Sequence, residues 1–365
     1  MDWKSDKVGF VGIVGYIISI PICNEIELHP SNRCEHMDGK VILMNAMTYK
    51  KKHIIRKVLL IILGMTAVFL LFSFIRHRVM LEGEKGLLIP PGQMVDVDGH
   101  KMHVYSVGEG EKTLVLMAAS GTVCPSLDFK NLYSSLGDDY RIVTVERFGY
   151  GYSDIVNRPR DIATILSDTR AALSGAGISG PYILCPHSYS GLEALYWAQT
   201  YPDEVEAIIG LDMAFPDAYN YTKGGALVEP YYLVQNGLIN LGVGRFFPDD
   251  TFLPEGGFLS ENEEKIYIAL VNLIGNNIDV AKEASAAKDS AKLVASGDKP
   301  DIPMLLFLSE KKLDGSNELW KGIAHNYAEG LNHVSFAELD CGHYIFHYEP
   351  ERIAEEIKVF LQDLD

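Results

Sequence analysis

The sequence predicts an α/β protein with a mostly parallel sheet that is covered by helices on both faces. An Asp98-Gly99 turn joins two alternating runs within residues 93–108, which is a strong hairpin signal. Six later runs are apolar or β-branched throughout, as expected for strands that are buried on both faces. Helical patterns separate these runs, and strands that alternate with helices favour parallel pairing.

The expected strands after the hairpin are spaced so that helices fit between several of them. They occupy residues 113–118, 141–146, 182–185, 205–212, 303–309 and 334–340. Together with the two hairpin strands, they predict an eight-stranded sheet. Apolar residues at helical spacing predict helices within 160–177 and 353–364. Gly175 and Gly177 are expected to end the first of these helices.

A long interval without a clear strand interrupts the alternation. It lies between Asp212 and Pro303 and contains helix-like segments. A helical insert between two core strands is most simply a cap over the ends of the sheet. We therefore expect a core formed by residues 90–212 and 302–365, with a helical cap in 213–301. Aromatic residues of the insert could line a pocket or pack between cap and core: Tyr219, Tyr221, Tyr231, Tyr232, Phe246 and Phe247.

Residues 58–75 form an uncharged apolar run that is just long enough to cross a bilayer as a helix. Basic residues flank the run, and more of them precede it than follow it. Since the more basic side tends to stay in the cytoplasm, we expect a single-pass anchor in the cell membrane with a cytoplasmic N-terminus. Residues 1–57 would lie inside, and 76–89 would link the lipid bilayer to an extracytoplasmic domain. The basic residues are Lys50, Lys51, Lys52, Arg56 and Lys57 before the run, and Arg76 and Arg78 after it.

A cleaved signal peptide is the alternative for this run, although no small-residue cleavage pattern follows it. Residues 8–23 form a second apolar run, which is shorter and rich in glycine and could be an additional span. We expect residues 1–46 to add little to the function.

Composition excludes several classes of partner. The formal net charge of −17 argues against nucleic acid, because phosphates require clustered Lys and Arg. The cysteines are scattered and form no C-x-x-C pair, so neither a disulfide framework nor a zinc knuckle is expected. The sequence implies no cofactor and no metal.

Ser188 stands between an expected strand that ends at Cys185 and an expected helix that begins near Tyr189. A strand–turn–helix setting is what the nucleophile-elbow motif Gly-x-Ser-x-Gly requires. Pro186 and Ser190 replace the two glycines, so the motif is imperfect. Ser188 as a helix N-cap is the alternative, and Ser190 is a second candidate nucleophile with less suitable neighbours.

A serine hydroxyl needs a base to become a nucleophile, and His343 is placed to act as one. It lies in a Gly-His turn after the last expected strand and before the final helix. Both Ser188 and His343 therefore follow strands, at the same edge of a parallel sheet. His347 lies four residues further on, but the Glu of H-E-x-x-H is missing, so we expect no zinc site.

The region from about residue 90 to 365 resembles the α/β-hydrolase superfamily in its capped branch. The resemblance rests on "PHSYSG" (186–191), "RFGYGYSD" (147–154), "CGHY" (341–344) and the insert after "GLDMAFP". It implies an α/β-hydrolase fold with a helical cap after the sixth strand, and a serine mechanism. In that mechanism Ser188 attacks a carbonyl, His343 takes its proton and an acid orients the histidine.

Two parts depart from the family pattern. The usual His-Gly after the third strand is absent, and we expect the backbone amides of Tyr189 and Ser120 to form the oxyanion hole. The acid is ambiguous. Asp314, which precedes His343 by 29 residues, is preferred, Asp212 is the alternative position used by some relatives, and Glu310 is a third candidate.

The serine narrows the chemistry that the resemblance implies, because capped relatives that open epoxides or remove halides need a carboxylate at that position. We expect hydrolysis of an ester, thioester or amide, with a small acyl compound as the substrate. An amino- or iminopeptidase is an alternative if an acidic patch at 260–265 holds a substrate ammonium. A non-catalytic binding or sensor protein on the same fold is a further alternative.

Overall fold

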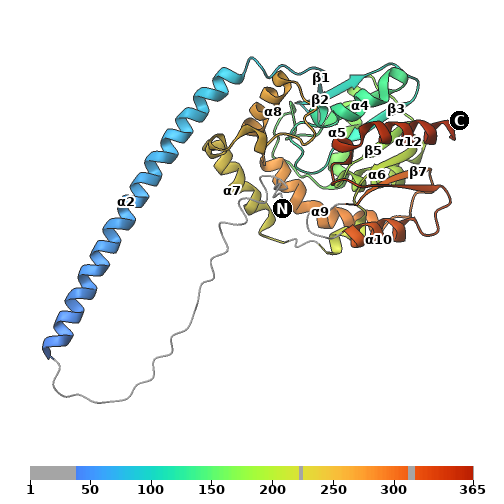
Figure 1. Cartoon of the computed structure of the whole chain (residues 1–365). Helices are drawn as coiled ribbons and strands as arrows, with labels where there is room; N and C mark the ends of the chain where they lie inside the picture. The colour runs from blue at the N-terminus through green and yellow to red at the C-terminus, as the bar shows by residue number, and fades with distance from the viewer. Residues whose placement is uncertain (1–37, 222–224, 311–316, 365) are drawn as a thin grey trace, which may run out of the picture.

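The computed structural model describes residues 38–221, 225–310 and 317–364. A long N-terminal helix, α2 (Asp38–Glu84), extends away from a rounded domain formed by the rest of the described chain (Figure 1). The second apolar run of the sequence, residues 8–23, lies outside the described residues.

The core of the domain is a single eight-stranded sheet with the order β1-β2-β4-β3-β5-β6-β7-β8. Strand β2 is antiparallel to both of its neighbours, and all other pairs are parallel. The eight predicted strands and the mostly parallel arrangement are therefore confirmed. The strands are β1 (Gln93–Val97), β2 (His100–Val107), β3 (Thr113–Met117), β4 (Arg141–Glu146), β5 (Tyr182–Pro186), β6 (Val205–Leu211), β7 (Met304–Ser309) and β8 (Val334–Leu339).

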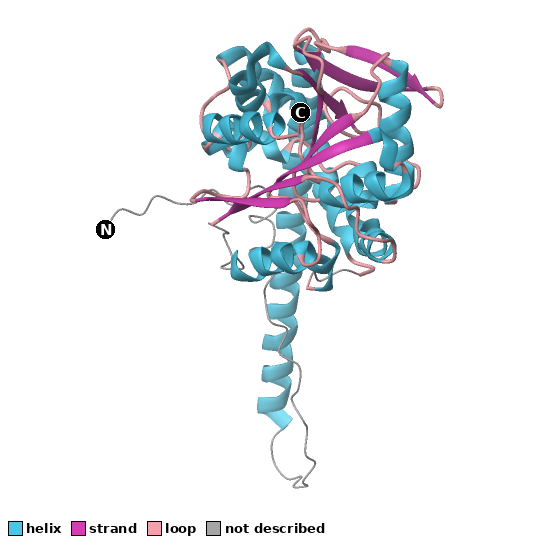
Figure 2. Cartoon of the chain, turned by 90° about the vertical axis from the view of Figure 1, so that its right-hand side faces the viewer, coloured by secondary structure: helices cyan, strands magenta, loops and turns pink. Residues whose placement is uncertain are grey.

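Helices cover both faces of the sheet (Figure 2). Because side chains alternate along a strand, Val115 and Met117 of β3 join one hydrophobic cluster, and Leu114 and Leu116 join the other. The first cluster includes residues of α5 (Ile162–Gly175), α6 (Ser190–Thr200) and α10 (Asn317–Ala328). The second includes residues of α4 (Lys130–Leu136), α11 (Ile345–Tyr348) and α12 (Pro350–Gln362), and α3 (Pro125–Asp128) precedes α4.

Residues 213–301, which we call the helical insertion, separate β6 from β7 and contain no strand in their described part. The interval without a strand was thus predicted correctly. Its helix α9 packs against α5 and α6, so the insertion contacts the core directly. The elements are η3 (Pro216–Asn220), α7 (Val228–Asn240), η4 (Val243–Phe246), η5 (Asp249–Thr251), α8 (Glu261–Ile274) and α9 (Ile278–Ala295).

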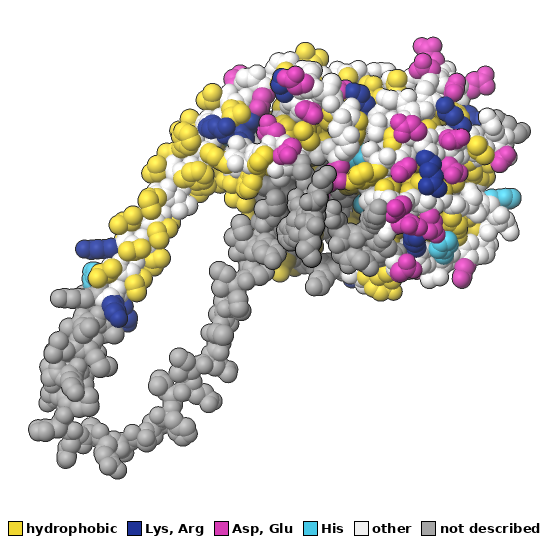
Figure 3. Space-filling model, viewed as in Figure 1, with side chains coloured by type: hydrophobic (Ala, Val, Ile, Leu, Met, Phe, Trp, Pro, Cys, Tyr) yellow, Lys and Arg dark blue, Asp and Glu magenta, His cyan; other side chains and the backbone are white. Residues whose placement is uncertain are grey.

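Helix α2 is long and apolar enough, by length and composition, to cross a membrane over part of Lys51–Glu84. Figure 3 shows apolar side chains along its described length, with basic side chains near both ends. The helix is longer than the predicted span of 58–75. Residues 76–84, expected to belong to a linker, instead continue it.

Contacts with the insertion explain why these residues remain helical. The Ser73 hydroxyl donates a hydrogen bond to the Leu241 carbonyl at 2.6 Å. Arg245, whose side chain is only 3% exposed, donates two hydrogen bonds of 2.7 Å to the carboxylate of Glu84. One turn before Ser73, the rings of Phe69 and Phe246 lie 5.1 Å apart. The end of α2 is therefore fixed to η4 and the end of α7.

Candidate active site

The turn between β5 and α6 carries Ser188 in the left-handed backbone region, with φ of 52°. A non-glycine residue in this region is strained by about 1–3 kcal/mol and persists only where its surroundings enforce it. The strand–turn–helix setting expected around Ser188 is confirmed. No side-chain hydrogen bond caps the start of α6, so the N-cap alternative for this serine is wrong.

Ser190 and a close backbone approach hold this turn in place. The Ser190 hydroxyl is buried, lies 2.7 Å from the Met117 carbonyl oxygen and accepts a hydrogen bond from the His187 N–H. The Ala214 N–H donates to the Ser188 carbonyl at 2.8 Å. A Cβ atom at Gly191 would lie 2.2 Å from the Ala214 oxygen. Close packing of this turn therefore requires a glycine at position 191. The Ser190 hydroxyl is used by hydrogen bonds to the backbone of the turn.

Pro186, the residue least expected in this turn, is accommodated by an interruption of the sheet. The continuous pairing of β5 with β6 ends at Leu184, and a single bridge from His187 to Leu211 resumes it. A proline is tolerated in a sheet where its missing N–H is not needed by the ladder. On the other side, the His187 N–H donates to the Met117 carbonyl at 2.8 Å.

Asp212 follows β6 and is fully buried, with φ of 50°. Its Oδ1 accepts hydrogen bonds from the Ser309 N–H and from Nε1 of Trp320, both at 3.0 Å. The Ser309 hydroxyl donates to Oδ2 at 2.7 Å. These donors satisfy the desolvated carboxylate and fix its orientation.

His343 follows β8, and its Nδ1 lies 2.5 Å from Oδ2 of Asp212. A proton on Nδ1 makes this a charge-assisted hydrogen bond and leaves Nε2 as an acceptor. The carbonyl oxygen of His343 lies 3.1 Å from Nε2 of the buried His187, which precedes Ser188 in the turn. Burial lowers the pKa of His187 well below its usual value, and the neighbouring His343 adds to this, so His187 is neutral.

The three candidate acids have different positions. Asp314, the preferred candidate, lies outside the described residues. Glu310 is exposed and forms a 3.4 Å ion pair with Lys321. Among the described residues, Asp212 is the candidate acid that contacts His343. Trp320, which binds the same carboxylate, had no signal in the sequence that pointed to this contact.

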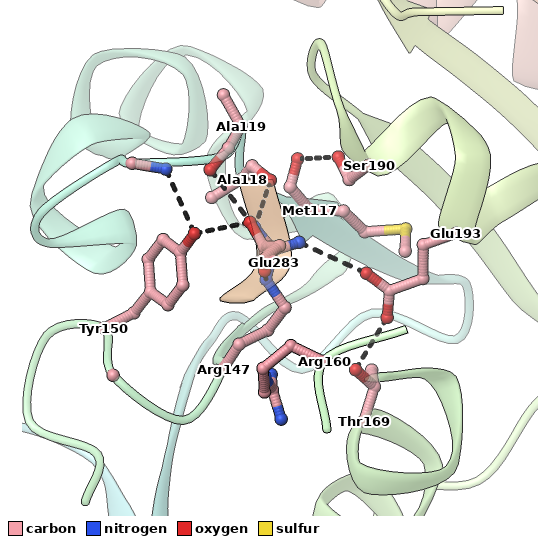
Figure 4. A network of polar contacts seen from close by, with 12 residues as sticks. Met117, Ala118, Ala119, Arg147, Tyr150, Arg160, Thr169, Ser190, Glu193 and Glu283 are labelled. Carbon is pink, nitrogen blue, oxygen red and sulfur yellow. Dashed lines mark hydrogen bonds and ion pairs between the residues drawn. The ribbon is translucent and has the colours of Figure 1, made fainter. Parts of the chain in front are cut away.

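The loop after β3 contains Ser120. Nη2 of Arg147 donates to the carbonyls of Ala118 at 3.1 Å and Ala119 at 3.2 Å, and the Gly121 N–H donates to the Tyr150 hydroxyl at 3.0 Å (Figure 4). Among the described residues, the N–H groups of Ser120 and Tyr189 donate no hydrogen bond. These two amides remain able to bind an external acceptor.

The acidic segment 260–265 forms the start of helix α8. Ser260 caps α8 in a capping box with Glu263. Glu263 also forms an ion pair with Lys130 of α4. The carboxylate of Glu263 is therefore used within the protein, and binding of a substrate ammonium by this segment stays a prediction. Among the described residues, no group of three His, Cys, Asp or Glu side chains is arranged to hold a metal ion.

Comparison with solved structures identifies the fold. An epoxide hydrolase of Bacillus megaterium superposes with a TM-score of 0.55 at 18% identity, covering 74% of this chain and 100% of that one. An esterase of Exiguobacterium antarcticum gives a TM-score of 0.53 at 18% identity, covering 74% and 99%. At this identity the likeness concerns the fold alone, and it is the α/β-hydrolase fold that the sequence resemblance implied.

A sequence comparison identifies the family. The uncharacterized protein YbdG of Bacillus subtilis is 36% identical over 311 residues, which cover 80% of this chain and 94% of YbdG. The chain therefore belongs to the same family as YbdG. No family model matches the sequence.

Proposed function

We propose that this protein is a membrane-anchored serine hydrolase that cleaves a small ester or amide through an acyl-enzyme. One observation carries the proposal. A buried, fully hydrogen-bonded Asp212 is paired with His343, and the backbone of that histidine contacts the strained turn that carries Ser188. Ser188 is the nucleophile in this proposal, His343 the base and Asp212 the acid.

In the first half of the reaction, Oγ of Ser188 attacks the acyl carbonyl carbon while Nε2 of His343 accepts the hydroxyl proton. Asp212 keeps the proton of the ring on Nδ1 and stabilises the imidazolium that forms. His343 then gives the new proton to the leaving alcohol or amine as the bond to the carbonyl carbon breaks. The serine is left as an ester of the acyl group.

In the second half, water attacks the acyl-enzyme and gives a proton to Nε2 of His343, which returns it to Ser188 as the acid product leaves. The N–H groups of Tyr189 and Ser120 stabilise the oxyanion in both halves. Removal of one such donor typically costs about 10²- to 10³-fold in kcat.

The serine also distinguishes this chain from some proteins that share its fold. Epoxide hydrolases occur among the superposed structures, and epoxide opening in capped enzymes of this type uses a carboxylate nucleophile. A hydroxyl at position 188 favours acyl transfer instead. The helical insertion acts as the cap in this proposal, because it lies between β6 and β7 and its Tyr219 ring contacts Tyr189 beside the nucleophile.

The proposal is tested by labelling the full-length chain in detergent with a fluorophosphonate and mapping the labelled peptide by mass spectrometry. We expect label on Ser188 and turnover of short p-nitrophenyl esters. Both should be lost in Ser188→Ala and His343→Ala. Label on Ser190, or no label on a folded chain, would contradict the proposal, and the second result would favour a binding or sensor protein.

For the anchor, we propose that α2 crosses the cell membrane once with a cytoplasmic N-terminus, since more basic residues precede the apolar run than follow it. An impermeant thiol reagent added to intact cells should label a Lys299→Cys variant but not a Lys51→Cys variant. The described native cysteines are buried, and both variants carry Cys23→Ser and Cys34→Ser as well, so that native thiols give little background. Labelling of Lys51→Cys alone would reverse the topology, and loss of the chain on carbonate washing would exclude a span.

A further inference from the structure

The carboxylate of Glu283, on helix α9 of the insertion, lies in the core next to the loop after β3. The side chain is fully buried, and its Oε1 accepts a hydrogen bond of 2.6 Å from the Tyr150 hydroxyl (Figure 4). Its Oε2 lies 3.2 Å from Nε of Arg147. Among the described residues, Glu283 therefore contacts both side chains that form hydrogen bonds with the backbone of residues 118–121.

The contact with Arg147 sets the direction of one amide in this loop. Because a peptide unit is planar and trans, its C=O and N–H point in opposite directions. The Ala119 carbonyl accepts a hydrogen bond from Arg147, so the N–H of Ser120, which belongs to the same peptide unit, points away from Arg147. Ser120 carries one of the two amides that we assign to the oxyanion hole.

The contact with Tyr150 fixes the next amide. A hydroxyl has one proton to donate, and the proton of Tyr150 is used for Glu283, which leaves an oxygen lone pair for the Gly121 N–H. Burial raises the pKa of Tyr150, and the Glu283 carboxylate raises it further, so the hydroxyl stays protonated. The Gly121 N–H is therefore already used by a hydrogen bond. Of the neighbouring amides of Ser120 and Gly121, that of Ser120 remains available to bind a substrate oxyanion.

The charge of the cluster depends on Glu283 as well. Burial alone would lower the pKa of Arg147, but the carboxylates of Glu283 and Glu193 outweigh it, and the guanidinium stays charged. Glu193 lies 3.3 Å from Nη1 and is held by the Thr169 hydroxyl at 2.7 Å. Glu193 belongs to α6 of the core, whereas Glu283 belongs to the insertion.

We propose that Glu283 is a positioning residue through which the helical insertion orients the Ser120 amide for catalysis. This inference rests on the proposed serine mechanism. It makes the insertion more than a cover over the site, because a shift of α9 would change the hydrogen bonds of Arg147 and Tyr150 and therefore the alignment of the oxyanion donor. Substrate contacts with the insertion would then act on kcat.

The test compares Glu283→Gln with Asp279→Asn in the full-length chain in detergent. Asp279 is the matched control, because it is a fully buried carboxylate one turn earlier on α9 whose hydrogen bonds come from the backbone of Val156 and Asn157 rather than from Arg147 or Tyr150. Gln at 283 can donate to Tyr150 and reverse its hydroxyl, which would turn a proton toward the Gly121 N–H.

Two measurements are made on each variant. Amide hydrogen exchange of peptides covering 117–123 should rise in Glu283→Gln and remain near wild type in Asp279→Asn. With p-nitrophenyl acetate, kcat should fall about 10- to 100-fold in Glu283→Gln with KM within about 2-fold, since the donor is misaligned but present. If Glu283→Gln does not fold, Tyr150→Phe takes its place. This variant removes the hydrogen bond between Tyr150 and Glu283 from the tyrosine side, so exchange of the same peptides should rise.

Equal exchange in Glu283→Gln and Asp279→Asn would overturn the inference, as would a change confined to KM. The exchange measurement does not depend on catalysis. If the wild-type chain hydrolyses no ester but the loop loosens only in Glu283→Gln, the proposed function fails while the positioning of the loop by the insertion stands.

Discussion

Nδ1 of His343 lies 2.5 Å from Oδ2 of Asp212, although 131 residues of sequence separate them. The carboxylate comes from the end of β6 and the imidazole from the end of β8, and β7 lies between these two strands in the sheet. The backbone of β7 and the side chain at its end support the pair, because Ser309 donates two hydrogen bonds to the same carboxylate.

This pairing predicts that Asp212→Asn lowers kcat for ester hydrolysis by about 10³- to 10⁴-fold, because an amide no longer enforces the Nδ1–H form of the base. KM should change little. Asp314→Asn is the direct comparison and should retain most of the activity. A larger loss in Asp314→Asn than in Asp212→Asn would transfer the role of the acid to Asp314.

The turn around Ser188 predicts that Gly191→Ala is strongly destabilising. The added methyl group would lie 2.2 Å from the backbone oxygen of Ala214, so backbone must shift, and overpacking of this kind costs about 1–3 kcal/mol. Gly237→Ala in α7 is the control, because nothing lies within 4 Å of its Cβ position. That change should stabilise by roughly 0.5–1 kcal/mol. Thermal unfolding measures the change in stability of both variants, and fluorophosphonate labelling reports whether the turn that carries Ser188 keeps its conformation.

Buried, neutral His187 predicts a loss of stability in acid. Its pKa is lowered in the folded state, so the unfolded chain binds more protons once the pH falls below about 6.5. The contribution of His187 to the free energy of unfolding is therefore complete above that pH, and it is lost as the pH falls toward the pKa of the folded state. In this range the free energy of unfolding falls by up to about 1.4 kcal/mol per pH unit for one proton. Denaturant unfolding at pH 7.5, 6.5 and 5.5 should show a shallower dependence in His187→Gln, and an unchanged slope would contradict the assignment.

The attachment of α2 to the insertion predicts a difference between two neighbouring glutamates. Glu84→Gln weakens the ion pair with the buried Arg245, whereas Glu82→Gln affects only an exposed pair with Lys85. A loss of about 1–2 kcal/mol at the first site would make undocking about 5- to 30-fold more frequent. Trypsin cleavage after Arg76 and Arg78 in detergent should accelerate accordingly in Glu84→Gln. Equal rates in both variants would mean that the ion pair does not hold the helix.

Much of the fold could be predicted because its strands are short apolar runs bounded by turns. Of the candidate site, Ser188 and His343 could be recognised because each follows an expected strand, and the ends of parallel strands meet at one edge. Asp212, at the end of the expected strand 205–212, was a candidate because relatives of the resembled family use that position. The contact between Asp212 and His343 could not be predicted, since it joins residues that are distant in sequence.

Other features were hidden for identifiable reasons. Glu283 lies in a helix rich in Ala and Lys, where a glutamate is normally solvent-exposed, so nothing local indicates its burial. Ser190 was weighed as a nucleophile, but its hydroxyl is used by the backbone of the turn. The helical state of residues 76–84 depends on Arg245, which is about 160 residues away in the sequence.

The fixed joint between α2 and the insertion has a mechanical consequence. A flexible tether would let the domain tumble above a bilayer and sample every orientation. A continuous helix that ends in a two-pronged ion pair fixes the orientation of the domain relative to the helix axis. In a chain anchored through α2, the domain would therefore move together with the helix, and any tilt of the helix in the bilayer would tilt the site by the same angle.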